Sequence, residues 1–246
     1  MKDIEFSFED AMIPQQRILE TAERLRPTIR NMANAISGGY EGDLASLYLP
    51  DDRLMLGKVR QVIGENLQLK PAYLIVIGIG GSNLGTIAVQ EAVLGKLYNQ
   101  LTTSTKVLYA DTVDSDSINN IITLIKPVLE KGGNILLNVI SKSGTTTETI
   151  ANAEVLIDIL RMHKKDYKNC ITVTSDKDSE LWNIAVKEGF NVLEIPPKVG
   201  GRYSVFSSAG LFPLGLLGID IERLLDGATH MREDCIDTNI EKTLQR

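Results

Sequence analysis

The stretch NILLNVISKSGTTTETI, residues 134–150, joins an apolar run to a segment dense in hydroxyl groups. Residues 134–140 are apolar enough to form a strand inside a sheet. Residues 141–149 hold six Ser or Thr residues, one lysine, one glycine and one glutamate. Helical spacing follows over residues 150–160. The stretch therefore predicts a β-strand that turns through a polar corner into a helix.

The same alternation of strand and helix extends to both sides of this stretch. We predict strands at residues 73–77, 106–110, 135–139, 170–174 and 192–195. We predict helices between them that begin near Ser82, Asp114, Thr145 and Asp178, with a last one after Arg202. Because parallel neighbours need long crossover connections, this repetition predicts an α/β fold, a three-layer α/β/α sandwich with a five-stranded parallel sheet.

Residues 1–70 carry helical patterns and no clear strand signal. Asp52 is predicted to cap a helix that runs toward Gly64. An earlier amphipathic helix is predicted from apolar residues at three- and four-residue intervals, namely Ile18, Leu19, Ala22, Leu25 and Ile29. We expect three parts: a helical segment at 1–70, the α/β domain at 71–219, and a helix at 220–246 that leads toward a second domain outside this chain.

Composition and charge favour a small-molecule partner. The net charge is -6 and no run of like charges stands out, so we expect no nucleic acid and no membrane as partner. The apolar runs at 74–79 and 211–219 are too short or too broken by Gly and Pro to cross a bilayer. The amino-terminal MKDIEFSFEDAM has no apolar targeting core, so we expect a cytoplasmic protein.

The two cysteines, Cys170 and Cys235, lie far apart and neither has metal-ligand spacing. Free cysteines are among the most buried residues, and they persist in reducing compartments. We therefore expect two core thiols and no metal site.

The polar corner at residues 141–149 has the chemistry of an anion site. It opens a helix, where unpaired backbone N–H groups and the helix dipole attract negative charge. Ser141, Ser143, Thr146 and Thr149 add O–H donors, and Lys142 adds a nearby cation. A phosphate ester, with about -1.5 to -2 charges and three acceptor oxygens, suits this set.

Two structural interpretations compete at this corner. Thr145 and Glu148 have the spacing of a capping box, which makes Glu148 a helix cap rather than a catalytic base. Alternatively, all the hydroxyl residues act only as turn formers. A cap uses one or two hydroxyls, whereas this corner holds six. We therefore favour an anion site at the start of a helix that the capping box also caps.

A glycine-rich corner, VIGIGGSNLGT at residues 76–86, follows the first predicted strand. A dinucleotide fingerprint that starts at Gly78 needs a sixth-position glycine, where Asn83 stands. A Walker A loop needs lysine where Thr86 stands. The remaining interpretation is a tight turn that brings backbone N–H groups and Ser82 to a ligand, such as a sugar phosphate lying across this corner and the hydroxyl corner.

An arginine corner, PPKVGGRYSVFSSAGLFPLG at residues 196–215, follows the last predicted strand. Arg202 stands just before a helix predicted to begin near Ser204. It either pairs with an acid structurally or faces the cleft, where its permanent charge and fork of donors suit an oxyanion that forms during a reaction.

Together GIGGSNLG, SKSGTTTET and VGGRYSVFSSAGLFPLG, in this order, resemble the glucose-6-phosphate isomerase (phosphoglucose isomerase) family of the compact bacterial type, from about residue 40 onward. The resemblance implies a sugar-isomerase (SIS) domain of flavodoxin-like fold. It implies interconversion of glucose 6-phosphate and fructose 6-phosphate, in glycolysis and gluconeogenesis, through a cis-enediol. It also implies no cofactor and a homodimer.

The resemblance assigns roles residue by residue. Arg202 would stabilise the enediolate, and Gly81 and Ser82 would contact the sugar. The phosphate ligands would be Ser141, Ser143, Thr146 and Thr149, with Lys142 beside them. Animal members carry a threonine and an aromatic residue where this chain has Ser143 and Gly144; the hydroxyl is kept, so phosphate binding is still expected.

The family's glutamate base, ring-opening histidine and a further lysine belong to a second half that this chain lacks. His163 and His230 stand in no matching motif. We therefore expect a fragment that is nearly inactive alone. Two alternatives remain: a stand-alone, non-catalytic SIS sugar-phosphate-binding module, and a dehydrogenase-type nucleotide-binding domain, which the glycine spacing disfavours.

Overall fold

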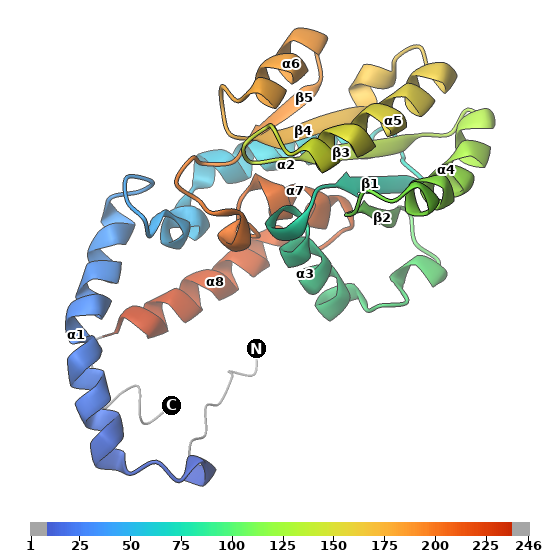
Figure 1. The fold of residues 1–246 in the computed structure, drawn as a ribbon. Coiled ribbons are helices and arrows are strands. Elements are labelled where there is room, and N and C mark those ends of the chain that lie inside the picture. The colour runs from blue at the N-terminus through green and yellow to red at the C-terminus, as the bar shows by residue number, and fades with distance from the viewer. Residues whose placement is uncertain (1–8, 238–246) are drawn as a thin grey trace.

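A computed structural model describes residues 9–237 (Figure 1). Its strands are β1 (Tyr73–Ile77), β2 (Lys106–Ala110), β3 (Ile135–Ile140), β4 (Ile171–Ser175) and β5 (Asn191–Glu194). Its α-helices are α1 (Gln15–Ser37), α2 (Arg53–Leu67), α3 (Leu84–Leu94), α4 (Ser115–Glu130), α5 (Thr147–His163), α6 (Glu180–Glu188), α7 (Ser208–Leu216) and α8 (Ile221–Ile236). Short 3-10 helices are η1 (Glu9–Ala11), η2 (Ala45–Asp51), η3 (Gly80–Ser82), η4 (Tyr98–Gln100), η5 (Tyr167–Cys170) and η6 (Gly201–Tyr203).

The five strands form one parallel sheet in the order β2-β1-β3-β4-β5. The predicted α/β class and parallel sheet are confirmed, and each strand lies within one residue of its predicted position. From β1 the chain first steps outward to β2 and then returns past β1 to β3. The order therefore reverses between β1 and β3, and the loops that follow these two strands leave toward opposite faces of the sheet.

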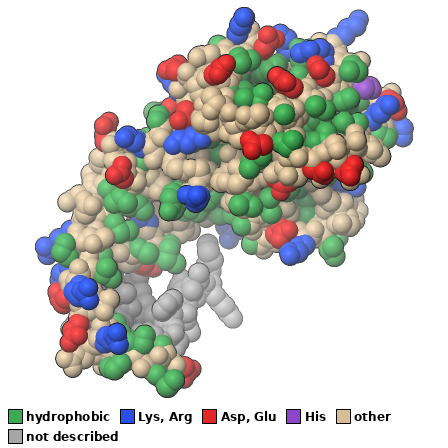
Figure 2. All heavy atoms as spheres, in the orientation of Figure 1, with side chains coloured by type: hydrophobic (Ala, Val, Ile, Leu, Met, Phe, Trp, Pro, Cys, Tyr) green, Lys and Arg blue, Asp and Glu red, His purple; other side chains and the backbone are tan. Residues whose placement is uncertain are grey.

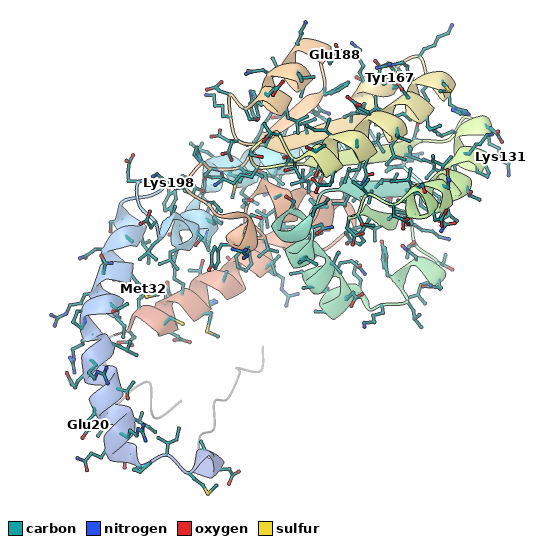
Figure 3. The ribbon with its side chains drawn as sticks, viewed as in Figure 1. Glu20, Met32, Lys131, Tyr167, Glu188 and Lys198 are labelled. Carbon is teal, nitrogen blue, oxygen red and sulfur yellow. The ribbon has the colours of Figure 1, made fainter. Side chains whose placement is uncertain are left out.

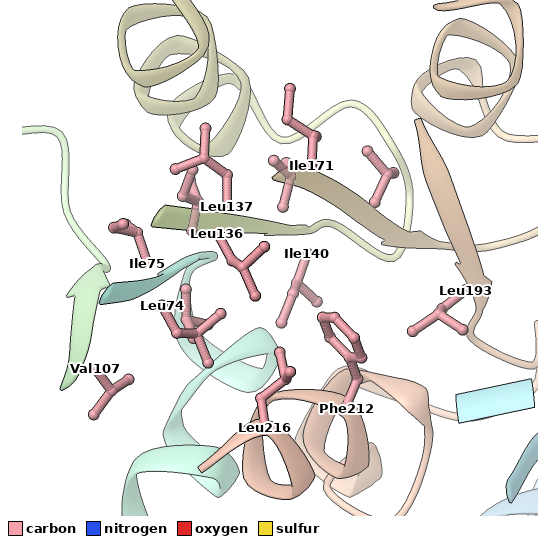
Figure 4. Packing of buried hydrophobic residues seen from close by; sticks show 14 of the residues in the cluster. Leu74, Ile75, Val107, Leu136, Leu137, Ile140, Ile171, Leu193, Phe212 and Leu216 are labelled. Atoms are coloured by element: carbon pink, nitrogen blue, oxygen red, sulfur yellow. The ribbon is translucent and has the colours of Figure 1, made fainter. Parts of the chain in front are cut away.

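The sheet lies between two helical layers (Figure 1). Helices α4, α5 and α6 cover one face, while α3 and α7 cover the other, with α2 packed beside α7. All six residues of β3 are buried, as is typical of a strand covered on both faces. Figure 4 shows Phe212 and Leu216 of α7 packed beneath the sheet, near Ile140. This burial holds the carboxyl ends of the strands rigidly in place.

Several helix starts follow the predictions closely. Asp52 caps α2 by accepting from the Met55 N–H at 2.8 Å, and Asp114 caps α4 through the Ser117 N–H at 2.8 Å. The helix predicted near Ser204 begins later, at Ser208. Arg202 lies before it in the short helix η6.

The described part of the predicted helical segment contains η1, α1, η2 and α2 and no strand, and α1 extends away from the body of the molecule (Figure 1). No residue of α1 is fully buried. Within the predicted apolar stripe, Ile18, Ala22 and Ile29 are half-buried, whereas Leu19 and Leu25 are exposed. In contrast, α2 packs tightly on α7. Gly215 of α7 lies so close to Ile63 of α2 that a Cβ added at Gly215 would lie 2.4 Å from Ile63 Cδ1. The divisions near residues 70 and 219 stay a prediction, and residues 238–246 lie outside the described part.

The two cysteines differ in burial. Cys170 is buried, as predicted, and burial raises the pKa of its thiol. The prediction for Cys235 is wrong, because its side chain is exposed. The buried residues of α8 are Ile221 and Leu225, near its start, whereas Cys235 lies in its last turn at an exposed position.

The surface carries both charges in mixture. On the face shown in Figure 2, Lys and Arg are interspersed with Asp and Glu rather than gathered into one basic patch. Among residues 9–237, no helix is long and apolar enough to cross a membrane.

Candidate active site

The glycine and hydroxyl corners meet where the strand order reverses. Gly78 follows β1, and a Cβ added there would lie 3.0 Å from the Ile140 carbonyl oxygen and 3.0 Å from Ser82 Cβ. The loop after β1 therefore lies against the end of β3, directly before Ser141. In open α/β sheets, ligands bind in the crevice at this reversal.

The arginine corner packs against the glycine corner. A Cβ added at Gly81 would lie 2.5 Å from the carbonyl carbon of Gly201 and 2.7 Å from the Arg202 nitrogen. The Ser204 hydroxyl also donates to the Gly81 carbonyl at 3.3 Å. The two backbones touch because neither glycine carries a side chain at the contact. All three predicted corners thus lie at one rim of the sheet.

The hydroxyls of residues 141–149 form two layers. Ser143 is exposed, and its oxygen accepts from both the N–H and the hydroxyl of Thr145, at 3.3 and 3.1 Å. Ser141 is buried and donates to the Thr146 hydroxyl at 3.0 Å. Thr149 is 1% exposed, and its hydroxyl has no hydrogen-bond partner among the described residues. Ser143 and Thr146 therefore form the outer layer, with Ser141 and Thr149 behind it.

The predicted capping box is wrong by one residue. Helix α5 begins at Thr147, its N-cap is Thr146 rather than Thr145, and Glu148 is its second residue. The Thr145 N–H is already paired with Ser143, and the Thr146 hydroxyl accepts from Ser141. No side chain caps α5, so the N–H groups of its first turn remain available to an anion.

The neighbouring strand β4 supports this corner through residues that the sequence analysis did not identify. The Ser175 hydroxyl donates to the Ser141 carbonyl at 2.6 Å, and the Asp176 N–H donates to the Lys142 carbonyl at 3.1 Å. Gly144 has a φ of 71°, and a Cβ there would lie 2.8 Å from Ser179 Oγ. A signal was present in the sequence: the TSDKDS run at residues 174–179, which begins in the last two residues of β4, is a second polar strand end.

Lys142 reaches across to the arginine corner. Its ammonium donates to the Pro197 carbonyl at 2.6 Å. The carboxyl of Asp176 lies nearby, and burial raises its pKa, with the Lys142 charge acting against that rise and Glu194 adding to it. The hydrogen bond to Pro197 therefore links the hydroxyl corner to the arginine corner.

Arg202 is exposed at the rim. Among residues 9–237, the structure contains no hydrogen bond or ion pair from its guanidinium, so the alternative of a structural acid partner has no support there. Within the same range, no group of three or more His, Cys, Asp or Glu residues lies close enough to hold a metal ion.

A separate hollow of about 390 Å³ lies between α2, α7 and the start of α8. None of the predicted site residues lines it. Its charged residues are Arg60, Asp220 and Glu222. Arg60 pairs with Glu222, so Asp220 leaves the lining net negative, which disfavours an anion. The three corners are therefore the better candidate for phosphate chemistry.

The family model for phosphoglucose isomerase matches residues 61–245, more than half of the chain. The chain belongs to the phosphoglucose isomerase family. Its similarity to individual members extends further: the glucose-6-phosphate isomerase of Leptospira biflexa is 33% identical over 231 residues, which covers 91% of this chain and 49% of that protein. A protein of Methanococcus maripaludis named "Probable glucose-6-phosphate isomerase" is 37% identical over 66% of this chain and 35% of its own length.

Solved structures agree with this family fold. A hypothetical protein from Thermus thermophilus is 31% identical and superposes with a TM-score of 0.76, over 92% of this chain and 52% of that one. A glucose-6-phosphate isomerase from Chlamydia trachomatis shares the fold, with a TM-score of 0.73 at 21% identity, over 93% of this chain and 48% of that one. The chain therefore spans about half the length of the relatives that it matches.

Proposed function

We propose that this chain supplies the phosphate-binding half of a glucose-6-phosphate isomerase, which interconverts glucose 6-phosphate and fructose 6-phosphate in glycolysis and gluconeogenesis. The observation that carries the proposal is an uncapped helix start, rich in hydroxyls, at the strand-order reversal of a chain that belongs to the phosphoglucose isomerase family. The expected partner is a hexose 6-phosphate, and the whole protein is expected to act in the cytoplasm as a homodimer without a cofactor.

The phosphate is bound at the start of α5. Ser143 and Thr146 donate from the outer layer, while Ser141 orients Thr146 through their hydrogen bond of 3.0 Å. Thr149 keeps a buried hydroxyl behind them. Lys142 supplies a positive charge, and the first-turn N–H groups supply further donors. The neutral donors can satisfy the acceptor oxygens of the dianionic phosphate, and Lys142 is the one cation among these side chains.

The sugar lies across the glycine corner toward Arg202. Backbone at Gly81 approaches closely, and Ser82 adds a hydroxyl. Moving a proton between C1 and C2 of an open-chain sugar places negative charge on an enediolate oxygen. The Arg202 guanidinium is permanently charged and unpaired among the described residues, so it is available to stabilise that charge in the transition state.

The proton transfer also needs a base, and a positioned base typically contributes about 10²- to 10⁴-fold. We assign the base to the half of the family's length that this chain does not span. The chain alone is therefore expected to bind hexose phosphate but to turn it over very slowly.

Calorimetric titration of the chain with glucose 6-phosphate, inorganic phosphate and glucose tests this function. Binding of the two phosphates, but not of glucose, is the expected result. Thr146→Val removes one hydroxyl that would contact a charged oxygen, so we expect about tenfold or more weaker binding. The control Thr147→Val removes the exposed neighbouring hydroxyl and should change binding less than about twofold.

Equal binding of glucose and glucose 6-phosphate would refute the phosphate site, as would equal losses in the two threonine variants. Binding of hexose phosphate by a whole-length protein that shows no isomerisation would instead indicate a non-catalytic sugar-phosphate-binding module.

A further inference from the structure

The loop that carries Arg202 is held at two places besides the hydroxyl corner. Val199 is fully buried and packs with Ala45 and Leu49 in a small cluster. Two residues later, the backbone at Gly201 and Arg202 presses against Gly81. Both contacts are independent of charge, and neither connects the loop to the anion site.

Lys142 makes that connection. Its backbone belongs to the hydroxyl corner and is fixed by the Asp176 N–H, while its ammonium donates to Pro197 at 2.6 Å. The two residues are 55 positions apart in the sequence. An ammonium has three N–H donors, so Lys142 can keep Pro197 and still donate to a bound phosphate.

Asp176 supports Lys142 through its backbone. It directly follows β4 and is half-buried, and its N–H donates to the Lys142 carbonyl at 3.1 Å. Among the described residues no ion pair joins its carboxylate to the Lys142 ammonium. The Lys142 ammonium is therefore positioned by its contact with Pro197.

We propose that Lys142 is a positioning residue that couples phosphate binding to the placement of Arg202. Its backbone is fixed in the hydroxyl corner by the Asp176 N–H, and its ammonium fixes the loop through Pro197. A phosphate at the hydroxyl corner adds a further acceptor and tightens the same link. Binding energy from the non-reacting phosphate is thereby used to place the group that meets the enediolate. The inference rests on the proposed function, since it assumes that the corner binds phosphate.

Amide hydrogen exchange of the 246-residue chain, with and without inorganic phosphate, tests the coupling. The reporters are the Val199 and Tyr203 amides, which donate to Pro196 and Gly200. Losing one hydrogen bond from a charged donor should speed their exchange about tenfold in Lys142→Met, and phosphate should slow it in the wild type but not in this variant. Lys142→Arg, which keeps a charged donor, should restore protection to within about threefold.

The matched control is Lys198→Met. Lys198 is exposed on the same loop, directly after Pro197 (Figure 3), and its loss changes the net charge equally. It should leave both reporters unchanged. Protection of Ile75 and Leu137 in the sheet core checks that each variant is folded.

Unchanged reporters in Lys142→Met, or an equal rise in Lys198→Met, would overturn the coupling through Lys142. The proposed function is judged separately, from protection of the amides of residues 143–149 by phosphate. If phosphate protects residues 143–149 without any change at Val199 and Tyr203, the phosphate site is supported and the coupling is refuted. If Lys142→Met loosens the loop but phosphate protects no amide of residues 143–149, the proposed function is refuted instead.

Discussion

Gly81 is the residue at which two of the site's loops touch. A Cβ at this position would lie 2.5 Å from Gly201 and 2.7 Å from Arg202, and both contacts are with backbone. Gly81→Ala must therefore push the loops apart, and we expect it to reduce the free energy of unfolding by about 1–3 kcal/mol. Urea unfolding measures this loss.

The matched control is Gly57→Ala. Gly57 lies inside α2, with nothing within 4 Å of an added Cβ. Alanine is the better helix former, so we expect stability to rise by up to about 1 kcal/mol. Similar effects of the two substitutions would show that close packing at Gly81 does not matter.

Arg202 is expected to act through the shape of its guanidinium. Arg202→Lys keeps the charge but loses the fork of donors. We expect it to weaken binding of a five-carbon aldonate 5-phosphate, whose carboxylate mimics the enediolate, by about tenfold or more. Binding of inorganic phosphate, for which we propose the hydroxyl corner, should change less than about twofold. Calorimetry measures both; equal losses would indicate that Arg202 binds the phosphate or is structural.

At the scale of elements, the Asn99 side chain occupies backbone hydrogen-bonding groups at one edge of the sheet. Strand β2 is an edge strand, and Asn99 pairs with both backbone groups of Val107: its amide nitrogen donates to the carbonyl at 2.7 Å, and its oxygen accepts from the N–H at 2.9 Å. Unpaired edges are templates for association. We expect Asn99→Ala to reduce stability by about 1–2 kcal/mol and to promote concentration-dependent self-association.

Urea unfolding and light scattering check the prediction for Asn99. Asn120→Ala, at an exposed position of α4, is the control and should change stability by less than about 0.5 kcal/mol without self-association. If Asn99→Ala remains as monodisperse as the control, the edge of β2 is protected in another way.

The elements themselves were well predicted from the sequence, and their boundaries less well. Strands β1 and β2 match the predicted residues, because short apolar runs between turn residues are a local signal. The N-cap of α5 was misplaced because a capping box is also local, whereas the Thr146 hydroxyl is engaged by Ser141 across the turn. The hydrogen bond between Ser141 and Thr146 therefore accompanies the shift of the α5 N-cap to Thr146.

At the scale of the whole molecule, Arg232 joins the last described helix to the N-terminal region. Its guanidinium binds both carboxylate oxygens of Asp51, at 2.8 and 3.0 Å, and the Leu47 carbonyl at 2.6 Å. The Arg232 side chain is only 10% exposed. Arg232→Met removes charged hydrogen bonds from a nearly buried site, so we expect a loss of about 2–3 kcal/mol and faster amide exchange in α8.

Arg60→Met is the control for Arg232. Arg60 also joins α8, through Glu222, but that ion pair is largely exposed, so we expect a loss below about 1 kcal/mol. Unfolding by urea and exchange along α8 compare the two variants. Equal losses would mean that burial of the Arg232 pair adds nothing.

The sequence by itself determined the five strands, the polar character of the three corners and the family. Each of these depends on neighbouring residues, whose pattern is readable without a fold. Only the tertiary structure decided that the corners share one rim, because strand order brings Gly81 beside Ser204, 123 positions later. It also revealed the burial of Asp176 and the contact between Lys142 and Pro197. Both depend on chain segments that meet only when the sheet is assembled.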